Sequence, residues 1–197
     1  MTQEPNPPVF ALNPITNIPI IVVGYCNPKD LTDCFQALRR MVAEPKFDIY
    51  VCENGGDVEF DLLVSSLCAI DGPCNLEADM QAMPEETPHF VRMRRLRLLG
   101  RDTRVFVAEA KENFGYAGAI NAWLRILMAF PAWPGAWILN PDTQPDDRAL
   151  AELVAWSALR CKGMVGSRIV SSAQPEFIHS RGLRWHPLRA STEAIDY

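Results

Sequence analysis

Two short polar motifs near the middle of this 197-residue chain carry the residue types best suited to chemistry. The first runs from Asn113 to Asn121 and has the sequence Asn-Phe-Gly-Tyr-Ala-Gly-Ala-Ile-Asn. The second runs from Asn140 to Thr143 and has the sequence Asn-Pro-Asp-Thr. Its carboxylate, Asp142, could hold Mg²⁺ or Mn²⁺, because these ions prefer hard oxygen ligands, often one or two carboxylates plus substrate phosphates. The alternative is that Asp142 only forms a turn or caps a helix.

The first motif contains two glycines at the start of a predicted helix. Gly115 and Gly118 would let the backbone approach a ligand closely. The helix that follows could direct its first backbone N–H groups at a phosphate, and Asn121 on its early turns could point back toward that site. The alternative is an ordinary helix N-terminus with Asn113 as its cap and no ligand.

A third polar group lies at residues 53–56, with the sequence Glu-Asn-Gly-Gly. Glu53 could accept hydrogen bonds from a ribose or a base edge, and Asn54 offers both a donor and an acceptor. The alternative is a simple turn, because an Asn-Gly pair suits positive φ.

The elements that must position these motifs follow from hydrophobic patterning. Apolar runs predict strands at 18–23, 47–52, 104–108, 136–139 and 164–170, with a further candidate at 177–185. Helical spacing and start signals predict helices that begin near residues 28, 58, 116 and 145. This alternation predicts an α/β fold with a largely parallel sheet covered by helices.

The predicted sheet brings the polar motifs to one edge. In open α/β sheets, ligands bind outside the carboxyl ends of the strands. Tyr25 and Asn27 follow the first predicted strand, and Glu53 and Asn54 follow the second. The motifs that begin at Asn113 and Asn140 follow the next two, so we expect all four to lie together.

Composition limits the organisation of the chain. With 48 % apolar residues, the chain can bury a sizeable core, and its length predicts one domain over residues 18–197. Residues 1–17 contain four prolines and are expected to form an extended arm. Residues 71–103 are expected to form an insertion or long loop, because the stretch from Asp71 to Pro88 is rich in Pro, Asp and Glu.

Charge and cysteine usage narrow the possible partners. A net charge of −5 argues against nucleic-acid binding, which needs a basic face. Six arginines between Arg92 and Arg104 predict a solvated face or contact surface, with a phosphate or anionic-lipid patch as the alternative. The six cysteines lack metal-ligand spacing and predict buried free thiols, and no apolar run is long enough to span a membrane.

Taken in order, four segments resemble a family 2 glycosyltransferase of the GT-A fold, closest to the bacterial rhamnosyltransferase-like branch. They are residues 18–27, 49–56, 113–121 and 139–143. The resemblance implies a Rossmann-like three-layer sandwich with a mostly parallel central sheet. It also implies an inverting enzyme that transfers a sugar from a nucleoside-diphosphate donor to a hydroxyl acceptor, in bacterial polysaccharide or glycolipid synthesis.

The resemblance assigns roles to the residues of the predicted edge. The turn from Tyr25 to Asn27 would lie near the base, and Glu53 matches a nucleoside-binding acid that is usually Asp. Asp142 matches the last acid of an Asp-x-Asp motif whose first position is Asn140, so a divalent metal would rest mainly on Asp142. The donor site implied comprises Tyr25, Asn27, Glu53, Asn54, Asn113, Gly115, Gly118, Asn121 and Asp142.

Members of this family continue into an acceptor-binding half that carries an acidic base. Residues up to Tyr197 contain no match for it, so the base is not identified and a partner chain could supply that half. The resemblance implies a sugar or lipid-linked acceptor met in the cytoplasm, with peripheral contact at the inner face of the membrane. The alternative is a truncated or degenerate domain that binds a nucleotide sugar without catalysis.

Overall fold

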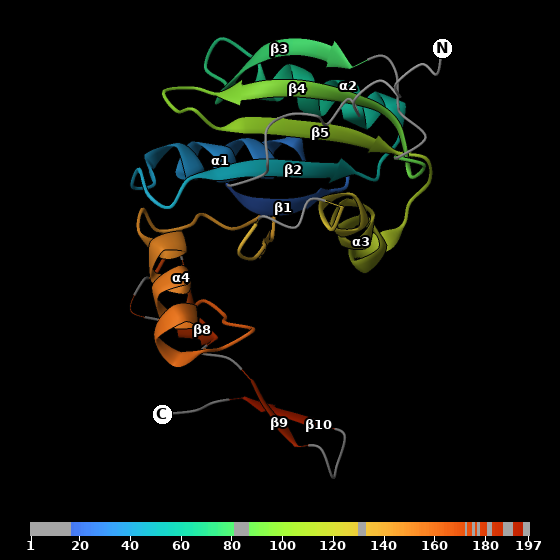
Figure 1. The fold of residues 1–197 in the computed structure, drawn as a ribbon. Helices are drawn as coiled ribbons and strands as arrows, with labels where there is room; N and C mark the ends of the chain where they lie inside the picture. The colour runs from blue at the N-terminus through green and yellow to red at the C-terminus, as the bar shows by residue number, and fades with distance from the viewer. Residues whose placement is uncertain are drawn as a thin grey trace, which may run out of the picture. The chain divides into compact units, whose positions relative to one another are not determined.

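The computed structural model describes residues 17–80, 87–129, 133–171, 173–174, 176, 178–180, 183–186 and 191–194 (Figure 1). The predicted extended arm, apart from Asn17, lies outside these residues. The described chain divides into two compact units, residues 1–147 and 148–197. The sequence analysis expected a single domain over residues 18–197, whereas these residues fall into two units. The candidate site belongs to the first unit.

The first unit is built on a six-stranded sheet of order β3-β4-β5-β2-β1-β6. Four neighbouring strands are parallel: β5 (Arg104–Ala110), β2 (Phe47–Glu53), β1 (Ile18–Gly24) and β6 (Trp137–Leu139). Every residue of β1 and β2 is buried, as expected for strands covered on both faces. The predicted α/β class and mostly parallel sheet are therefore confirmed.

The other two strands correct the sequence analysis. β3 (Cys74–Met80) lies in the segment predicted as a loop, and β4 (Phe90–Leu98) completes an antiparallel pair with it. Buried Phe90, Met93 and Leu96 alternate imperfectly with arginines along β4, so the apolar pattern is weak in sequence. β3 is an edge strand with a register shift between Leu76 and Ala78, and such strands carry little apolar signal.

Three helices cover the sheet, with α1 and α2 together on one face and α3 on the other (Figure 1). α1 (Pro28–Arg40) begins with proline, which is pre-organised for the first helical position. α2 (Asp57–Leu67) has acids in its first turn, and α3 (Gly115–Leu127) is the most apolar of the three. Each helix lies where the sequence predicted it, within a few residues at the ends.

The core on the α3 face contains a cluster of aromatic rings. Trp123 of α3 meets Tyr50 edge to face at 5.1 Å and Phe90 at 4.7 Å between ring centroids. Tyr50 in turn stacks on Phe106 at 5.1 Å. This packing fixes α3 against the sheet, and with it the loop that precedes the helix.

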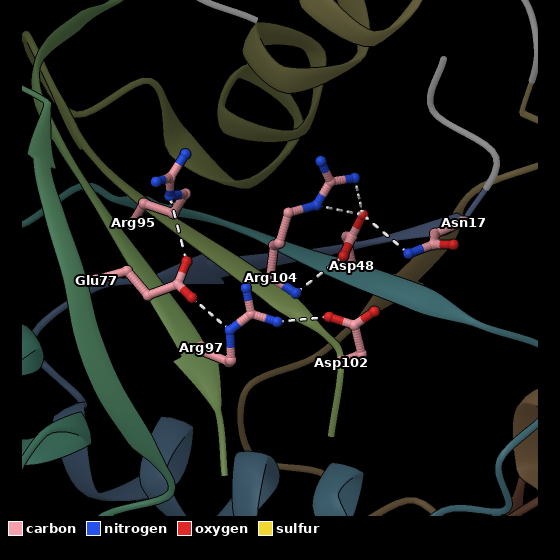
Figure 2. Close-up of polar contacts among 7 residues, drawn as sticks. All are labelled: Asn17, Asp48, Glu77, Arg95, Arg97, Asp102 and Arg104. Atoms are coloured by element: carbon pink, nitrogen blue, oxygen red, sulfur yellow. Dashed lines mark hydrogen bonds and ion pairs between the residues drawn. The ribbon is translucent and has the colours of Figure 1, made fainter. Parts of the chain in front are cut away.

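The arginines of β4 and β5 are engaged within the molecule (Figure 2). Arg95 and Arg97 pair with Glu77 of β3, and Arg104 pairs with the fully buried Asp48. Arg92 of β4 pairs with Glu109 and Asp61. Arg101, between the two strands, donates to main-chain carbonyls at residues 39, 41 and 42. These contacts favour a structural role for the set over an anion-binding patch.

The six cysteines are free, but only three of them are fully buried as predicted. Cys34, Cys52 and Cys74 are buried, whereas Cys26 and Cys161 are exposed. Burial raises the pKa of the Cys34 and Cys52 thiols to about 12, so both stay protonated. Within the described chain, no helix combines the length and apolar character required to cross a bilayer.

The second unit contains α4 (Ala149–Arg160) and two antiparallel strand pairs. The helix begins a few residues after the predicted start, and the left-handed residue Cys161 ends it. The strand predicted at 164–170 is reduced to β7 (Ile169–Val170), which pairs with β8 (Ile178–Ser180). The described residues of the candidate at 177–185 belong to β8 and to β9 (Leu183–His186), and β9 pairs with β10 (Ser191–Ala194).

Candidate functional site

The four parallel strands end side by side, and a polar turn follows each of them. The chain leaves β1 for β2 on one side, and it leaves β5 through α3 for β6 on the other side of β1. The strand order therefore reverses between β1 and β6. Such a reversal opens a crevice at the carboxyl edge, where ligands of open α/β sheets bind.

A cleft of about 450 Å³ lies at this edge. Its walls come from the four turns and from the first turns of α1 and α3. The lining residues are Val23, Tyr25, Asn27, Asp30, Asn54, Asn113, Gly115, Tyr116, Asn140, Pro141 and Asp142. The motifs that the sequence analysis selected from four separate segments therefore meet around one cavity.

The turn after β1 is held by a side chain of its own. The backbone N–H of Tyr25 donates to Oδ1 of Asn27 at 2.9 Å, just before α1 begins at Pro28. Tyr25 is 59 % exposed and lines the cleft. Cys26 between them has φ of 53°, a left-handed conformation that makes this turn tight.

Glu53 is buried and does not line the cleft. One carboxylate oxygen, Oε1, accepts the backbone N–H groups of Gly55 at 2.8 Å and Cys26 at 3.4 Å. The other oxygen, Oε2, lies 2.2 Å from the place where a Cβ on Gly24 would be, so a larger residue there would displace the carboxylate. Burial raises the pKa of Glu53, and the hydrogen bonds from Gly55 and Cys26 act in the opposite direction. In this structure Glu53 ties two turns together.

Asn54 connects the turn after β2 to the start of the motif from Asn113 to Asn121, which we call the glycine loop. Its Oδ1 accepts the backbone N–H of Phe114 at 3.4 Å, and its Nδ2 donates to the carbonyl of Gly115 at 3.3 Å. The residue is 6 % exposed yet still reaches the cleft wall. Asn54 therefore positions the loop and also forms part of its surface.

The two glycines of the motif from Asn113 to Asn121 have different roles. Gly115 lines the cleft with φ of +66°, and no atom lies within 4 Å of the place where its Cβ would be. Gly118 instead faces Phe114, whose Cβ lies 2.8 Å from that place, so it serves close packing. Asn121 is exposed on α3 and is not among the lining residues.

Asn113 supports this loop through its side chain. Its Oδ1 accepts the backbone N–H of Gly115 at 2.8 Å, which turns the chain into α3. The prediction that Asn113 caps the helix is wrong, because the cap residue of α3 is Phe114 and its side chain makes no capping hydrogen bond. Asn113 lies one residue before the cap and lines the cleft.

The turn after β6 presents Asp142. Thr143 closes the turn, with its backbone N–H and its hydroxyl donating to the carbonyl of Asn140 at 3.3 and 2.6 Å. Asp142 is exposed on the cleft wall, and its charge adds to burial in raising the pKa of Cys34 beneath it. Tyr116 of α3 donates its hydroxyl to Oδ1 of Asn140 at 2.6 Å.

Two lining residues with useful chemistry escaped the sequence analysis. Asp30, in the first turn of α1, brings a second carboxylate to the cleft. Tyr116 lies inside the motif from Asn113 to Asn121, but the sequence analysis assigns no role to its hydroxyl. A polar residue at the N-terminus of a helix that follows a parallel strand is the signal that could have found Asp30.

Two carboxylates among the described residues line the cleft, and carboxylate oxygen is a ligand type that divalent cations prefer. No group of three or more His, Cys, Asp or Glu side chains suited to a metal occurs in the described part of the chain. Asp142 and Asp30 are the carboxylates of the cleft, and Mg²⁺ is often held by one or two carboxylates plus substrate phosphates.

Comparison with models of known protein families gave no match, and comparison with curated proteins gave none.

Proposed function

We propose that the cleft binds a nucleoside-diphosphate sugar together with a divalent cation, and that the chain serves as an inverting glycosyltransferase. The observation that carries this proposal is the meeting of four polar turns around one cleft at the strand reversal. Their residues are those of the segments that resemble family 2 enzymes. Dinucleotides and nucleotide sugars suit such a crevice because it offers backbone N–H groups and helix starts.

Electrostatics supports a cation in this proposal. The residues that line the cleft include Asp30 and Asp142 but no Lys, Arg or His among those described. A diphosphate would be repelled by these carboxylates unless a divalent ion neutralised part of its charge. Asp142 would hold the ion, and Asp30 is placed in the same cavity. When bound, the ion would supply Lewis-acid stabilisation of the departing diphosphate.

The remaining residues would bind and orient the donor. Tyr25 offers an exposed ring for stacking on a base, and Gly115 leaves open space beside the backbone for a phosphate or sugar. In the transfer, the acceptor hydroxyl would form a bond to the anomeric carbon as the bond to the diphosphate oxygen breaks. The hydroxyl proton requires a base, which the described residues of the cleft do not identify.

A thermal-shift titration tests the donor site. UDP, dTDP, GDP and their sugars are added with and without Mn²⁺ or Mg²⁺ to the wild type and to Asp142→Ala. A ligand that binds only the folded state raises stability by RT ln(1 + [L]/Kd), which is about 2.7 kcal/mol at a hundredfold excess over Kd. We expect a metal-dependent rise with one nucleotide that is lost in Asp142→Ala.

Asp146→Ala is the matched control, since Asp146 lies in the following turn and does not line the cleft. An equal rise in Asp142→Ala and the wild type would refute the role of Asp142. No rise with any nucleotide would refute the proposed donor. Nucleotide binding without transfer of the sugar to water or to any acceptor would favour a binding domain over an enzyme.

A further inference from the structure

In the side-chain amides of Asn27 and Asn113, the oxygen already accepts a hydrogen bond from the backbone, so only the nitrogen is free to face a ligand. Oδ1 of Asn27 accepts the backbone N–H of Tyr25 at 2.9 Å, and Oδ1 of Asn113 accepts that of Gly115 at 2.8 Å. A backbone N–H can only donate, so it fixes the amide oxygen as its partner. The amide nitrogen of each side chain is left as the end that a ligand can meet.

Asn140 follows the same pattern with a side-chain donor. The hydroxyl of Tyr116 donates to its Oδ1 at 2.6 Å, across 24 positions of sequence. Both residues line the cleft beside Asp142. One lone pair of the Asn140 oxygen is thus engaged by Tyr116, although the resemblance to an Asp-x-Asp motif assigns that side chain to the metal.

This orientation suits the charge of the cleft. Two carboxylates line it and no cationic side chain does among the described residues, so an anionic ligand needs neutral donors as well as a cation. An amide nitrogen donates two hydrogen bonds and adds no charge. A phosphate oxygen is a strong acceptor for such groups.

We propose that Asn140 acts as a hydrogen-bond donor to the ligand and not as a metal ligand, and that Tyr116 is the positioning residue that holds it so. Asn27 and Asn113 contribute donors of the same kind. The inference rests on the proposed function for the identity of the ligand, a nucleoside diphosphate. The assignment of the amide ends does not depend on that identity.

The two assignments of Asn140 predict opposite results for Tyr116→Phe. If Asn140 is a donor, loss of the hydroxyl lets the amide rotate and weakens nucleoside-diphosphate binding by about tenfold, roughly one hydrogen bond. The affinity for Mn²⁺ alone stays the same. If Asn140 is a metal ligand, loss of the hydroxyl frees its oxygen and the affinity for Mn²⁺ rises.

Two titrations on the full chain separate these results. Mn²⁺ alone is followed by its electron paramagnetic resonance signal, and the nucleoside diphosphate is followed by calorimetry with saturating Mn²⁺. The variants are Tyr116→Phe, Asn140→Ala and Asp142→Ala, with Asn75→Ala as the control, because Asn75 lies on β3 and does not line the cleft. We expect unchanged Mn²⁺ affinity in Tyr116→Phe and Asn140→Ala, with nucleotide affinity lowered in both.

A loss of Mn²⁺ affinity in Asn140→Ala, or a gain in Tyr116→Phe, would overturn the inference while leaving the proposed function intact. Nucleotide affinity equal to wild type in both variants would also overturn it. If the wild type binds no nucleotide, the proposed function fails on its own. The Mn²⁺ titrations then decide whether Asn140 is a metal ligand: equal Mn²⁺ affinity in wild type and Asn140→Ala supports the inference, and a lower affinity in Asn140→Ala refutes it.

Discussion

The buried pair of Asp48 and Arg104 offers a sharp test of the fold that supports the cleft (Figure 2). Oδ1 of Asp48 accepts the backbone N–H of Arg104 at 2.9 Å. Oδ2 accepts Nε at 3.1 Å and Nη2 at 2.5 Å. The Asp48 side chain is fully buried and that of Arg104 is 22 % exposed, so water replaces these bonds poorly. The contact joins β2 to the start of β5.

Asp48→Asn keeps the shape of the side chain and removes its charge. One of the two carboxylate oxygens becomes an amide nitrogen, which faces donors of Arg104 whichever way it turns. Breaking a buried ion pair from one side costs about 3–5 kcal/mol. Because Arg104 retains some contact with water, we expect the lower end of this range, about 3 kcal/mol. For a chain of this size, that lowers Tm by about 6–12 °C.

Asp102→Asn is the matched control. Asp102 pairs with Arg97 at 2.5 Å, but its side chain is 86 % exposed, and exposed pairs contribute about 0–1 kcal/mol. Urea unfolding followed by circular dichroism measures both variants, with the slope m checked against wild type. If Asp48→Asn loses no more stability than Asp102→Asn at equal m, the argument from burial is wrong.

Two further predictions concern the turns of the cleft. Burial raises the pKa of the Glu53 carboxyl in the folded protein, so ionisation of Glu53 above about pH 4.5 lowers the stability of the wild type. Glu53→Gln cannot ionise, so its stability relative to wild type should increase as pH rises through this range. A difference in urea midpoint that does not change with pH would contradict this. Gly115→Val should lower nucleotide affinity while the fold survives, with a stability loss of about 1–2 kcal/mol for its positive φ. Gly135→Val, in a position that is also open but without positive φ, is the control, and equal nucleotide affinity in the two variants would count against the role of the loop.

The parallel part of the sheet was predictable because its signals are local. β1 and β2 are continuous apolar runs, and each ends at a polar turn that is visible in sequence. The strands β3 and β4 were not predictable in the same way. Their charged side chains satisfy one another across strands, as Glu77 does for Arg95 and Arg97, and such pairing leaves no apolar period to detect.

The candidate site was also predicted only in part from the sequence. Seven of the residues selected from sequence line the cleft: Tyr25, Asn27, Asn54, Asn113, Gly115, Asn140 and Asp142. Glu53 and Gly118 do not, because the first turns inward to two backbone N–H groups and the second accommodates Phe114. Asn121 lies on an exposed part of α3. These departures depend on side-chain direction, which spacing alone does not specify.

The sequence by itself determined where polar residues interrupt apolar strands, since strand ends and turns are set by neighbouring residues. Only the tertiary structure decided which of these residues share a cavity and which end of each amide it meets. Asp30 lines the same cleft as Asp142, and the Tyr116 hydroxyl donates to Asn140, although each pair is far apart in sequence. Contacts between residues far apart in the chain depend on the three-dimensional path of the backbone. The number of residues between them does not specify that path.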